Sequence, residues 1–234
     1  MIIKMVQLVL LVGPFFIRGD NQMIVLSGTI GAGKTSLTTL LAGHLNAPAF
    51  YESVDDNEIL PLFYKDPKKY AFLLQIYFLN KRLDSIKEAN IDKYSVMDRS
   101  IFEDSLLFHL NADLGRSTET EVDIYDSLLQ NMMEPIPGSD FQKNPDLLIY
   151  IKVSFETMLQ RIKRRGRSFE QIENDDSLYD YYRELNQRYT KWYADYDLSP
   201  KMMIDGDRYD FMNDGTAREQ VLADVDQKLK KVLG

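Results

Sequence analysis

Short apolar runs alternate with longer amphipathic stretches along most of this chain. An apolar run of strand length predicts a strand, and apolar positions three and four residues apart predict a helix. Strands that alternate with helices form a parallel sheet with helices on both faces, so we predict an α/β fold around a five-stranded parallel sheet. The predicted strands are 23–27, 47–51, 94–97, 146–151 and 201–204. The predicted helices are 36–45, 67–89, 102–110, 121–133, 157–165, 177–196 and 217–233.

Acidic residues follow two of the predicted strands. Glu52 comes after the second apolar run, and Asp98 comes after the third. In an open parallel sheet the ligand lies beyond the carboxyl ends of the strands, so both carboxylates are candidate site residues. Each one taken alone is also explained as a helix N-cap or a solvated turn residue.

The segment between the first predicted strand and the first predicted helix matches the phosphate-binding pattern G-x-x-x-x-G-K-[ST] at every position. Its glycines let backbone N–H groups turn toward one centre, and the following helix adds its positive end, which suits a nucleoside triphosphate better than a chance glycine-rich turn. Lys34 is expected to reach the β- and γ-phosphates, and the Thr35 hydroxyl to bind Mg²⁺. The expected ATP-binding loop is Gly28, Thr29, Ile30, Gly31, Ala32, Gly33, Lys34 and Thr35.

The amino-acid composition excludes several classes of function for this chain. The chain has 234 residues, of which 44% are hydrophobic and 27% charged, as in an ordinary globular domain. A net charge of −8 argues against a general nucleic-acid binder. Because the chain contains no cysteine, disulfides, thiolate metal sites and a cysteine nucleophile are excluded.

The first 22 residues precede the first predicted strand and differ in pattern from the rest of the chain. Lys4 is followed by an apolar run at 5–12 that superficially resembles a signal peptide. The run is too short to span a bilayer, and no small-x-small cleavage site follows it. We therefore expect 1–22 to be a dispensable extension or a misassigned start, and 23–234 to be the functional domain. A peripheral membrane contact and a targeting role are the alternatives; no other segment approaches membrane length.

Further motifs follow the phosphate-binding loop in a characteristic order. Gln75 and Arg82 are two helical turns apart and so share one helix face. Beyond them lie Asp98-Arg99-Ser100 with Glu103-Asp104, and then a basic segment at 161–170. This set, together with Glu52, resembles the deoxynucleoside kinases, and most closely their bacterial deoxyadenosine/deoxyguanosine kinase branch, over about 23–233. The resemblance implies a P-loop kinase fold with an arginine-rich lid.

The resemblance also implies roles for the acidic strand ends. Glu52 corresponds to the carboxylate near the sugar 5′-hydroxyl that serves as general base, which is the group that attack on the γ-phosphate needs. Asp98 corresponds to an acidic residue that holds the Mg²⁺ shell together with Thr35, although Asp98 is also a candidate base. Arg99 is expected to neutralise the 5′-oxygen region and to orient Glu52. The expected catalytic residues are thus Glu52, Asp98 and Arg99.

The acceptor pocket follows from the same resemblance. Gln75 corresponds to the residue that reads the base, since its amide offers both a donor and an acceptor. Arg82 and Asp104 are expected on the far side of the base, a pairing more typical of purine and cytosine kinases than of thymidine kinases. Tyr64 and Glu170 correspond to the pair that hydrogen-bonds the sugar 3′-hydroxyl.

The basic segment resembles the lid that closes over the phosphates. Arg161, Arg165 and Arg167 match lid positions and are expected to bind ATP, whereas Lys163 and Arg164 are expected on a solvated helix face. The loop 205–211 falls where the donor adenine rests in this family. Six tyrosines are expected to pack with their hydroxyls at the surface. They are Tyr179, Tyr181, Tyr182, Tyr189, Tyr193 and Tyr196.

Together these inferences predict an ATP-dependent kinase that phosphorylates the 5′-hydroxyl of deoxyadenosine or deoxyguanosine in nucleotide salvage. It would need Mg²⁺, bind neither nucleic acid nor membrane, and work in the cytoplasm as a homodimer or a heterodimer of related subunits. A thymidylate-type kinase is one alternative, although Glu52 would oppose a phosphate on the acceptor. A regulatory NTPase is another, but the run Asn80-Lys81-Arg82-Leu83 departs from a guanine-reading motif at its fourth position. A membrane-tethered binding protein led by 1–22 is the third.

Overall fold

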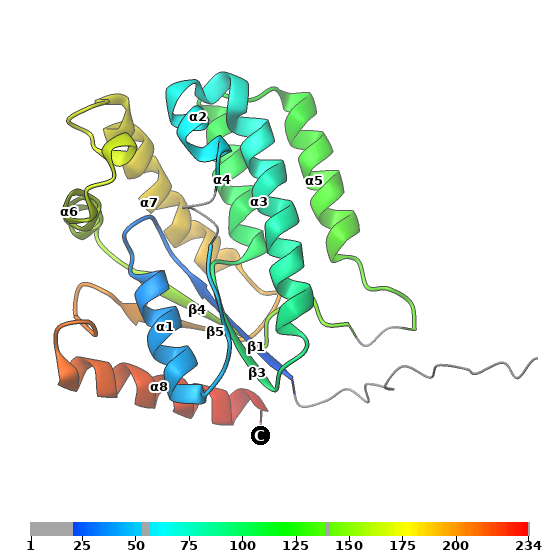
Figure 1. The fold of residues 1–234 in the computed structure, drawn as a ribbon, viewed down its shortest axis with the longest axis vertical. Coiled ribbons are helices and arrows are strands. Elements are labelled where there is room, and N and C mark those ends of the chain that lie inside the picture. Colours follow the sequence, from blue (N-terminus) through cyan, green and yellow to red (C-terminus); the bar gives the residue numbers. More distant parts are fainter. Residues whose placement is uncertain (1–20, 53–56, 139–140, 234) are drawn as a thin grey trace, which may run out of the picture.

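A computed structural model describes residues 21–52, 57–138 and 141–233, and most of the predicted extension 1–22 lies outside these ranges. The chain folds around one parallel sheet of five strands in the order β2-β3-β1-β4-β5 (Figure 1). The predicted number and direction of the strands are therefore confirmed. The strands are β1 (Gln22–Ser27), β2 (Ala49–Phe50), β3 (Tyr94–Asp98), β4 (Leu147–Lys152) and β5 (Lys201–Asp205).

Each predicted helix is present, with ends that differ by a few residues. The structure adds two elements that the sequence pattern did not indicate, α2 and the 3₁₀ turn η1; both are short, and Pro61 interrupts the helical pattern in α2. The first helix begins at Lys34 rather than 36, so the end of the phosphate-binding loop is already its first turn. The helices are α1 (Lys34–Leu45), α2 (Ile59–Lys65), α3 (Pro67–Ala89), α4 (Ile101–Asp113), α5 (Glu119–Met133), α6 (Phe155–Arg165), η1 (Ser168–Glu170), α7 (Ser177–Asp195) and α8 (Gly215–Leu233).

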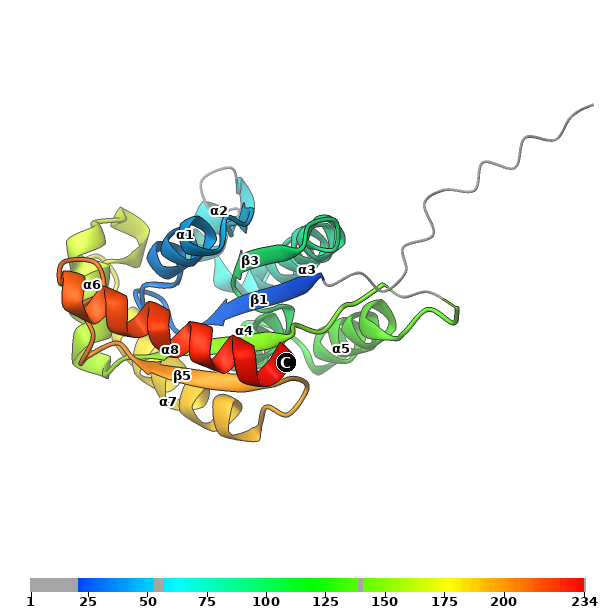
Figure 2. The same cartoon turned by 90° about the horizontal axis from the view of Figure 1, so that it is seen from below.

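The central strand β1 shows how the sheet is covered on both faces. Its side chains alternate between two clusters of buried apolar residues, because successive residues of a strand point to opposite faces. Ile24 and Leu26 pack in the cluster that contains residues of α1 and α8. Met23 and Val25 pack in the cluster that contains residues of α3, α4 and α5. Figure 2 shows the sheet between these helices.

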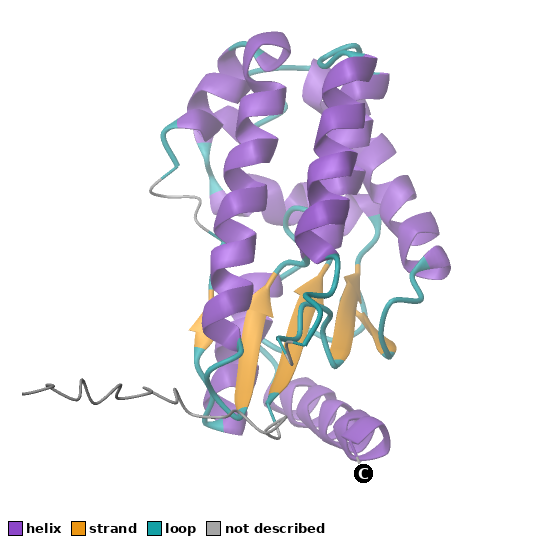
Figure 3. Cartoon of the chain, turned by 90° about the vertical axis from the view of Figure 1, so that its right-hand side faces the viewer, coloured by secondary structure: helices purple, strands orange, loops and turns teal. Residues whose placement is uncertain are grey.

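Local sequence also sets where the helices near the carboxyl ends of the strands begin. The Asp66 side chain accepts a hydrogen bond from the Lys69 amide at the start of α3, with Pro67 at the first helical position. Ser100 and Glu103 form a capping box at the start of α4, directly after β3. The carboxyl ends of the strands point toward the group of helices in the upper part of Figure 3. Because β1 and β3 are parallel neighbours, the loops that follow them lie side by side at this end of the sheet.

Candidate active site

The phosphate-binding loop is wrapped around its own lysine. The Lys34 ammonium donates to the carbonyl oxygens of Gly28 and Thr29, at 2.8 and 3.0 Å. Burial, with Arg99 nearby, lowers the pKa of Lys34 to about 8. Gly28 has a φ of 147°, and a Cβ there would lie 2.7 Å from the Ile151 carbonyl oxygen. Only glycine fits that position, so the sharp turn between β1 and α1 depends on it.

Thr35 and Asp98 meet across the carboxyl ends of β1 and β3. The Thr35 hydroxyl donates to one carboxylate oxygen of Asp98. The other oxygen, Oδ1, is buried and has no hydrogen-bond partner among the described residues. Buried carboxylate oxygens are normally paired, so an unpaired one beside a phosphate loop suits a metal ion or a water bound to it.

Glu52 lies between two buried arginines. Its Oε1 is 2.8 Å from Arg99 Nε and 3.3 Å from a terminal nitrogen of Arg82. Burial alone would raise the pKa of Glu52, but Arg99 and Arg82 outweigh it and hold the pKa below its usual range. The carboxylate is therefore ionised at neutral pH, which lets it accept a proton. The contact between Arg99 and Glu52 that the sequence predicts is present.

Arg99 is held in an unusual backbone conformation. Its φ is 107°, a region that residues with a side chain rarely adopt, so the surrounding contacts must stabilise it. Besides Glu52, its guanidinium donates to the Tyr189 hydroxyl at 2.8 Å and lies 3.8 Å from Glu103. Tyr189 and Glu103 are fully buried. Neither residue has a role in the site expected from the sequence. The contact of Tyr189 with Arg99 depends on how α7 packs, and the contact of Glu103 with the Gly28 amide depends on how α4 packs.

The helix face predicted to carry Gln75 and Arg82 is buried. Gln75 is 3% exposed, so it does not lie on a solvated face, and its Oε1 has no hydrogen-bond partner among the described residues. Arg82 Nε lies 3.4 Å from Asp104 Oδ2, while Asp104 Oδ1 is likewise unpaired there. Burial raises the pKa of Asp104 to about 6, although Arg82 opposes the shift. Of these two unpaired oxygens, the one on Gln75 belongs to a residue that lines the cleft.

Tyr64 and Glu170 lie at the other side of the pocket. Glu170 is buried and pairs with Arg165 and, at 3.6 Å, with Arg167. Its backbone carbonyl accepts from the Tyr182 hydroxyl at 3.0 Å. The Tyr64 ring packs on Phe169 with centroids 4.9 Å apart. Burial raises the pKa of Tyr64 well above its usual value, so its hydroxyl stays protonated and available as a donor.

The basic segment forms the end of α6 and the turn after it. Arg161 donates to the carbonyl oxygens of Ala32 and Gly206, both at 2.7 Å, and so links the phosphate-binding loop to the loop after β5. Lys163 pairs with Glu173 on the solvent side, as the sequence predicts. Arg164 is exposed to solvent, as expected, and also borders the cleft.

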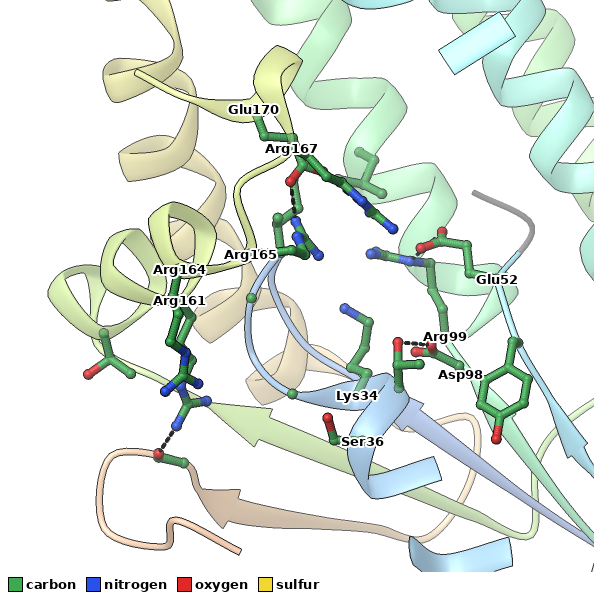
Figure 4. Close-up of a pocket in the computed structure, with 18 of the residues that line it drawn as sticks. Lys34, Ser36, Glu52, Asp98, Arg99, Arg161, Arg164, Arg165, Arg167 and Glu170 are labelled. Atoms are coloured by element: carbon green, nitrogen blue, oxygen red, sulfur yellow. Dashed lines mark hydrogen bonds and ion pairs between the residues drawn. The ribbon is translucent and has the colours of Figure 1, made fainter. Parts of the chain in front are cut away.

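These groups surround one cleft of about 1090 Å³. Figure 4 shows Lys34, Arg99 and Arg165 pointing into it from different elements. The loop 205–211 contributes Gly206, Asp207, Tyr209, Asp210 and Phe211 to its wall. Arg82 and Asp104 lie behind this wall rather than in it, since neither lines the cleft. The cleft therefore joins a phosphate loop, an arginine lid and a pocket with an ionised carboxylate.

Comparison with known proteins identifies the family. A family model described as Deoxynucleoside kinase matches residues 24–230. The chain belongs to the deoxynucleoside kinase family. The kinase activity expected from its motifs is confirmed by this match.

Individual deoxynucleoside kinases extend the comparison. A deoxyguanosine kinase of Lactobacillus acidophilus is 58% identical over 210 residues, covering 90% of this chain and 92% of that protein. A deoxyadenosine kinase of the same bacterium is 56% identical over 211 residues, covering 90% and 98%. The solved deoxyadenosine kinase of M. mycoides with dCMP and dCDP superposes with a TM-score of 0.73 at 28% identity, covering 88% of this chain and 100% of that one. The predicted P-loop kinase fold is confirmed.

Two further expectations are tested by the structure. Tyr182 and Tyr189 are fully buried and their hydroxyls bond Glu170 and Arg99, so placing these hydroxyls at the surface was wrong. Tyr179 does lie at the surface.

Within 21–52, 57–138 and 141–233, no helix combines the length and apolar character needed to cross a membrane.

Proposed function

We propose that this deoxynucleoside kinase transfers the γ-phosphoryl group of ATP to the 5′-hydroxyl of deoxyadenosine or deoxyguanosine. The observation that carries the proposal is the shared cleft, which both the phosphate-binding loop and the Glu52–Arg99 pair line. Such a transfer needs a cradle for the donor and an ionised carboxylate for the acceptor at one place. The similarity to deoxyguanosine and deoxyadenosine kinases of L. acidophilus supports the purine preference.

The donor would lie on the phosphate-binding loop. Backbone N–H groups of residues 28–35 and the N-terminus of α1 bind its phosphates, and Lys34 leaves the loop carbonyls to reach the β- and γ-phosphates. Arg161, Arg165 and Arg167 neutralise charge on the transferred group when the lid closes. The donor base would rest against the loop 205–211, which borders the cleft.

Thr35 and Asp98 are the proposed Mg²⁺ ligands. The unpaired, buried Oδ1 of Asp98 and the adjacent Thr35 hydroxyl are oxygen donors of the kind that Mg²⁺ prefers and would hold the ion. When bound, the ion neutralises the charge that develops on the phosphates. Asp98 is the second candidate for the base, because it lies at the same edge of the sheet as Glu52.

Glu52 is the proposed general base. As the acceptor oxygen bonds to the γ-phosphorus and the bond to the ADP oxygen breaks, the hydroxyl proton passes to the Glu52 carboxylate. Arg99 keeps that carboxylate ionised and oriented through the 2.8 Å contact. The low pKa of Glu52 ensures that the base is free at neutral pH, and proton transfer then follows as the hydroxyl becomes acidic during bond formation.

The acceptor base would be read by Gln75, with Asp104 and Arg82 at its far side. The unpaired oxygen on Gln75, which lines the cleft, suits an N–H donor of a purine edge, and pairing it offsets the cost of burying it. Tyr64 and Glu170 are the proposed partners of the 3′-hydroxyl. Glu170 would then exchange part of its contact with Arg165 for the sugar.

We further propose that the enzyme works in the cytoplasm, where ATP is available, and serves nucleotide salvage. A homodimer or a heterodimer of related subunits is the proposed assembly. The occurrence of two similar kinases in L. acidophilus supports a related partner. Light scattering of the purified chain, alone and mixed with a related kinase, measures the assembly directly.

The reaction is tested by product analysis. Purified protein is incubated with ATP, Mg²⁺ and each of the four deoxynucleosides, and separately with each deoxynucleoside monophosphate. The proposal predicts deoxynucleoside 5′-monophosphates, formed fastest from deoxyadenosine or deoxyguanosine. Diphosphate formed only from monophosphate acceptors contradicts it and favours the thymidylate-type alternative.

A further inference from the structure

Glu103 is a buried carboxylate that the proposed reaction leaves without a role. It is fully buried, lies on the first turn of α4 and does not line the cleft. Its neighbour Asp104 faces Arg82, whereas Glu103 turns toward the phosphate-binding loop. A buried acid is costly unless its oxygens are paired, so the partners of Glu103 indicate what it does.

The two oxygens of Glu103 bind two different loops. Oε1 accepts from the Gly28 amide at 3.0 Å, at the first residue of the phosphate-binding loop. Oε2 accepts from the Ser100 amide at 2.7 Å, directly after Arg99. One side chain therefore connects the loop that follows β1 with the loop that follows β3.

Each of these loops orients a charged group of the site. The Gly28 carbonyl accepts from Lys34, so the position of the Gly28 peptide affects the lysine. On the other side, Ser100 follows Arg99, whose strained φ must be held by its surroundings, and Glu103 Oε1 also lies 3.8 Å from the Arg99 guanidinium. A shift of Glu103 would displace the donor loop and the acceptor arginine relative to each other.

We propose that Glu103 is a positioning residue that fixes the phosphate-binding loop and the Arg99 turn in one geometry, so that the γ-phosphate and the 5′-hydroxyl meet in line. This inference rests on the proposed kinase reaction. Alignment of the two substrates matters most in the transition state, where a misplacement of about 1 Å costs on the order of 100-fold in rate. The loss should therefore appear in kcat rather than in the binding of either substrate.

The first test variant is Glu103→Gln. Glutamine has nearly the same shape as glutamate, and its carbonyl oxygen can accept a hydrogen bond from one of the two backbone amides. Its NH₂ group then faces the other amide, and because both groups are donors, that hydrogen bond is lost. We expect kcat to fall about 10- to 100-fold, with KM for ATP and for the deoxynucleoside within about threefold. The active fraction is counted by the binding stoichiometry of a non-hydrolysable ATP analogue, so that misfolded protein does not mimic a loss of kcat.

Glu121→Gln is the matched control. Glu121 occupies the same position in the capping box of α5, where its Oε2 accepts from the Thr118 amide at 2.7 Å, the distance that Glu103 makes to Ser100. It lines neither the cleft nor the phosphate-binding loop. We expect this variant to change thermal stability but not kcat. An equal loss of kcat in both variants would assign the effect to capping and overturn the proposal.

Glu103→Asp separates position from charge. The aspartate keeps the negative charge near Arg99 but is one methylene too short to reach both amides at once. The proposal predicts a lowered kcat here too, and wild-type kcat would overturn it.

Hydrogen exchange on the unmodified protein adds a measurement that needs no variant. The Gly28 and Ser100 amides should exchange slowly, and rapid exchange at Gly28 contradicts the hydrogen bond from its amide to Glu103. Absent kinase activity in the wild type would instead refute the proposed function.

Discussion

The chemistry of the cleft rests on a few buried charges whose neighbours set their protonation. Glu52, Arg82, Arg99 and Asp104 form a continuous ion-pair chain that reaches the cleft at Glu52 and Arg99. In such a chain, removing one partner leaves another charge buried without compensation, which costs more than a surface pair would.

Asp104 should make stability depend on pH in a defined window. Its pKa is raised from the ordinary value to about 6, so between about pH 4 and 6 the folded protein binds a proton that the unfolded chain has released. Stability contributed by this group is therefore lost as the pH rises through 6. We expect wild type to gain unfolding free energy relative to Asp104→Asn when the pH falls from 7 to 5, measured by urea titration of both proteins. A difference that is constant with pH would contradict the raised pKa.

Asp98→Asn distinguishes the metal role from the base role. If Asp98 holds Mg²⁺, the Mg²⁺ concentration for half-maximal activity rises about 10- to 100-fold and excess Mg²⁺ restores most of kcat. Activity that stays low at saturating Mg²⁺ would assign the proton transfer to Asp98. Asp123→Asn on the exposed side of α5 is the control and should leave the Mg²⁺ titration unchanged.

At the scale of elements, the turn between β1 and α1 carries the strictest backbone requirement. Gly28→Ala forces a side chain into a positive φ and against the Ile151 carbonyl, so we expect a cost of at least about 1–3 kcal/mol in unfolding free energy and weaker ATP binding. Gly43→Ala in α1 is the matched control, since nothing lies within 4 Å of its added Cβ. That change should stabilise the protein by about 0.5–1 kcal/mol. Equal effects in denaturant titrations would contradict the role of the turn.

Some elements and site residues could be predicted from the sequence, and others could not. The alternation of apolar runs with amphipathic stretches predicted the sheet. Contiguous motifs, such as the phosphate-binding loop, and the strand-end acids predicted groups around the cleft. The short α2 was missed because seven residues that include a proline carry too little periodicity. The Glu103–Gly28 and Arg99–Tyr189 hydrogen bonds were missed for another reason: each joins residues distant in sequence, so only packing reveals it. The position of Arg164 at the border of the cleft is of the same kind, because the direction of α6 relative to the cleft is a tertiary property.

At the scale of the whole molecule, the fold brings two half-sites together. The order β2-β3-β1-β4-β5 places β1 beside β3, so the loop that binds a triphosphate adjoins the loop that carries Arg99. Glu52 follows β2 on one side, and the lid follows β4 and α6 on the other. Membership of the deoxynucleoside kinase family fits this arrangement, since both substrates must occupy one cleft.

The kinetics of Glu52→Gln test the central claim most directly. The amide keeps the size of the side chain but cannot take the hydroxyl proton, so the account predicts that kcat falls about 10²- to 10⁴-fold. The Kd for the deoxynucleoside, measured by calorimetry, should stay within about threefold of wild type. An unchanged kcat with ATP, Mg²⁺ and deoxyadenosine or deoxyguanosine would show that Glu52 is not the base and would contradict the account.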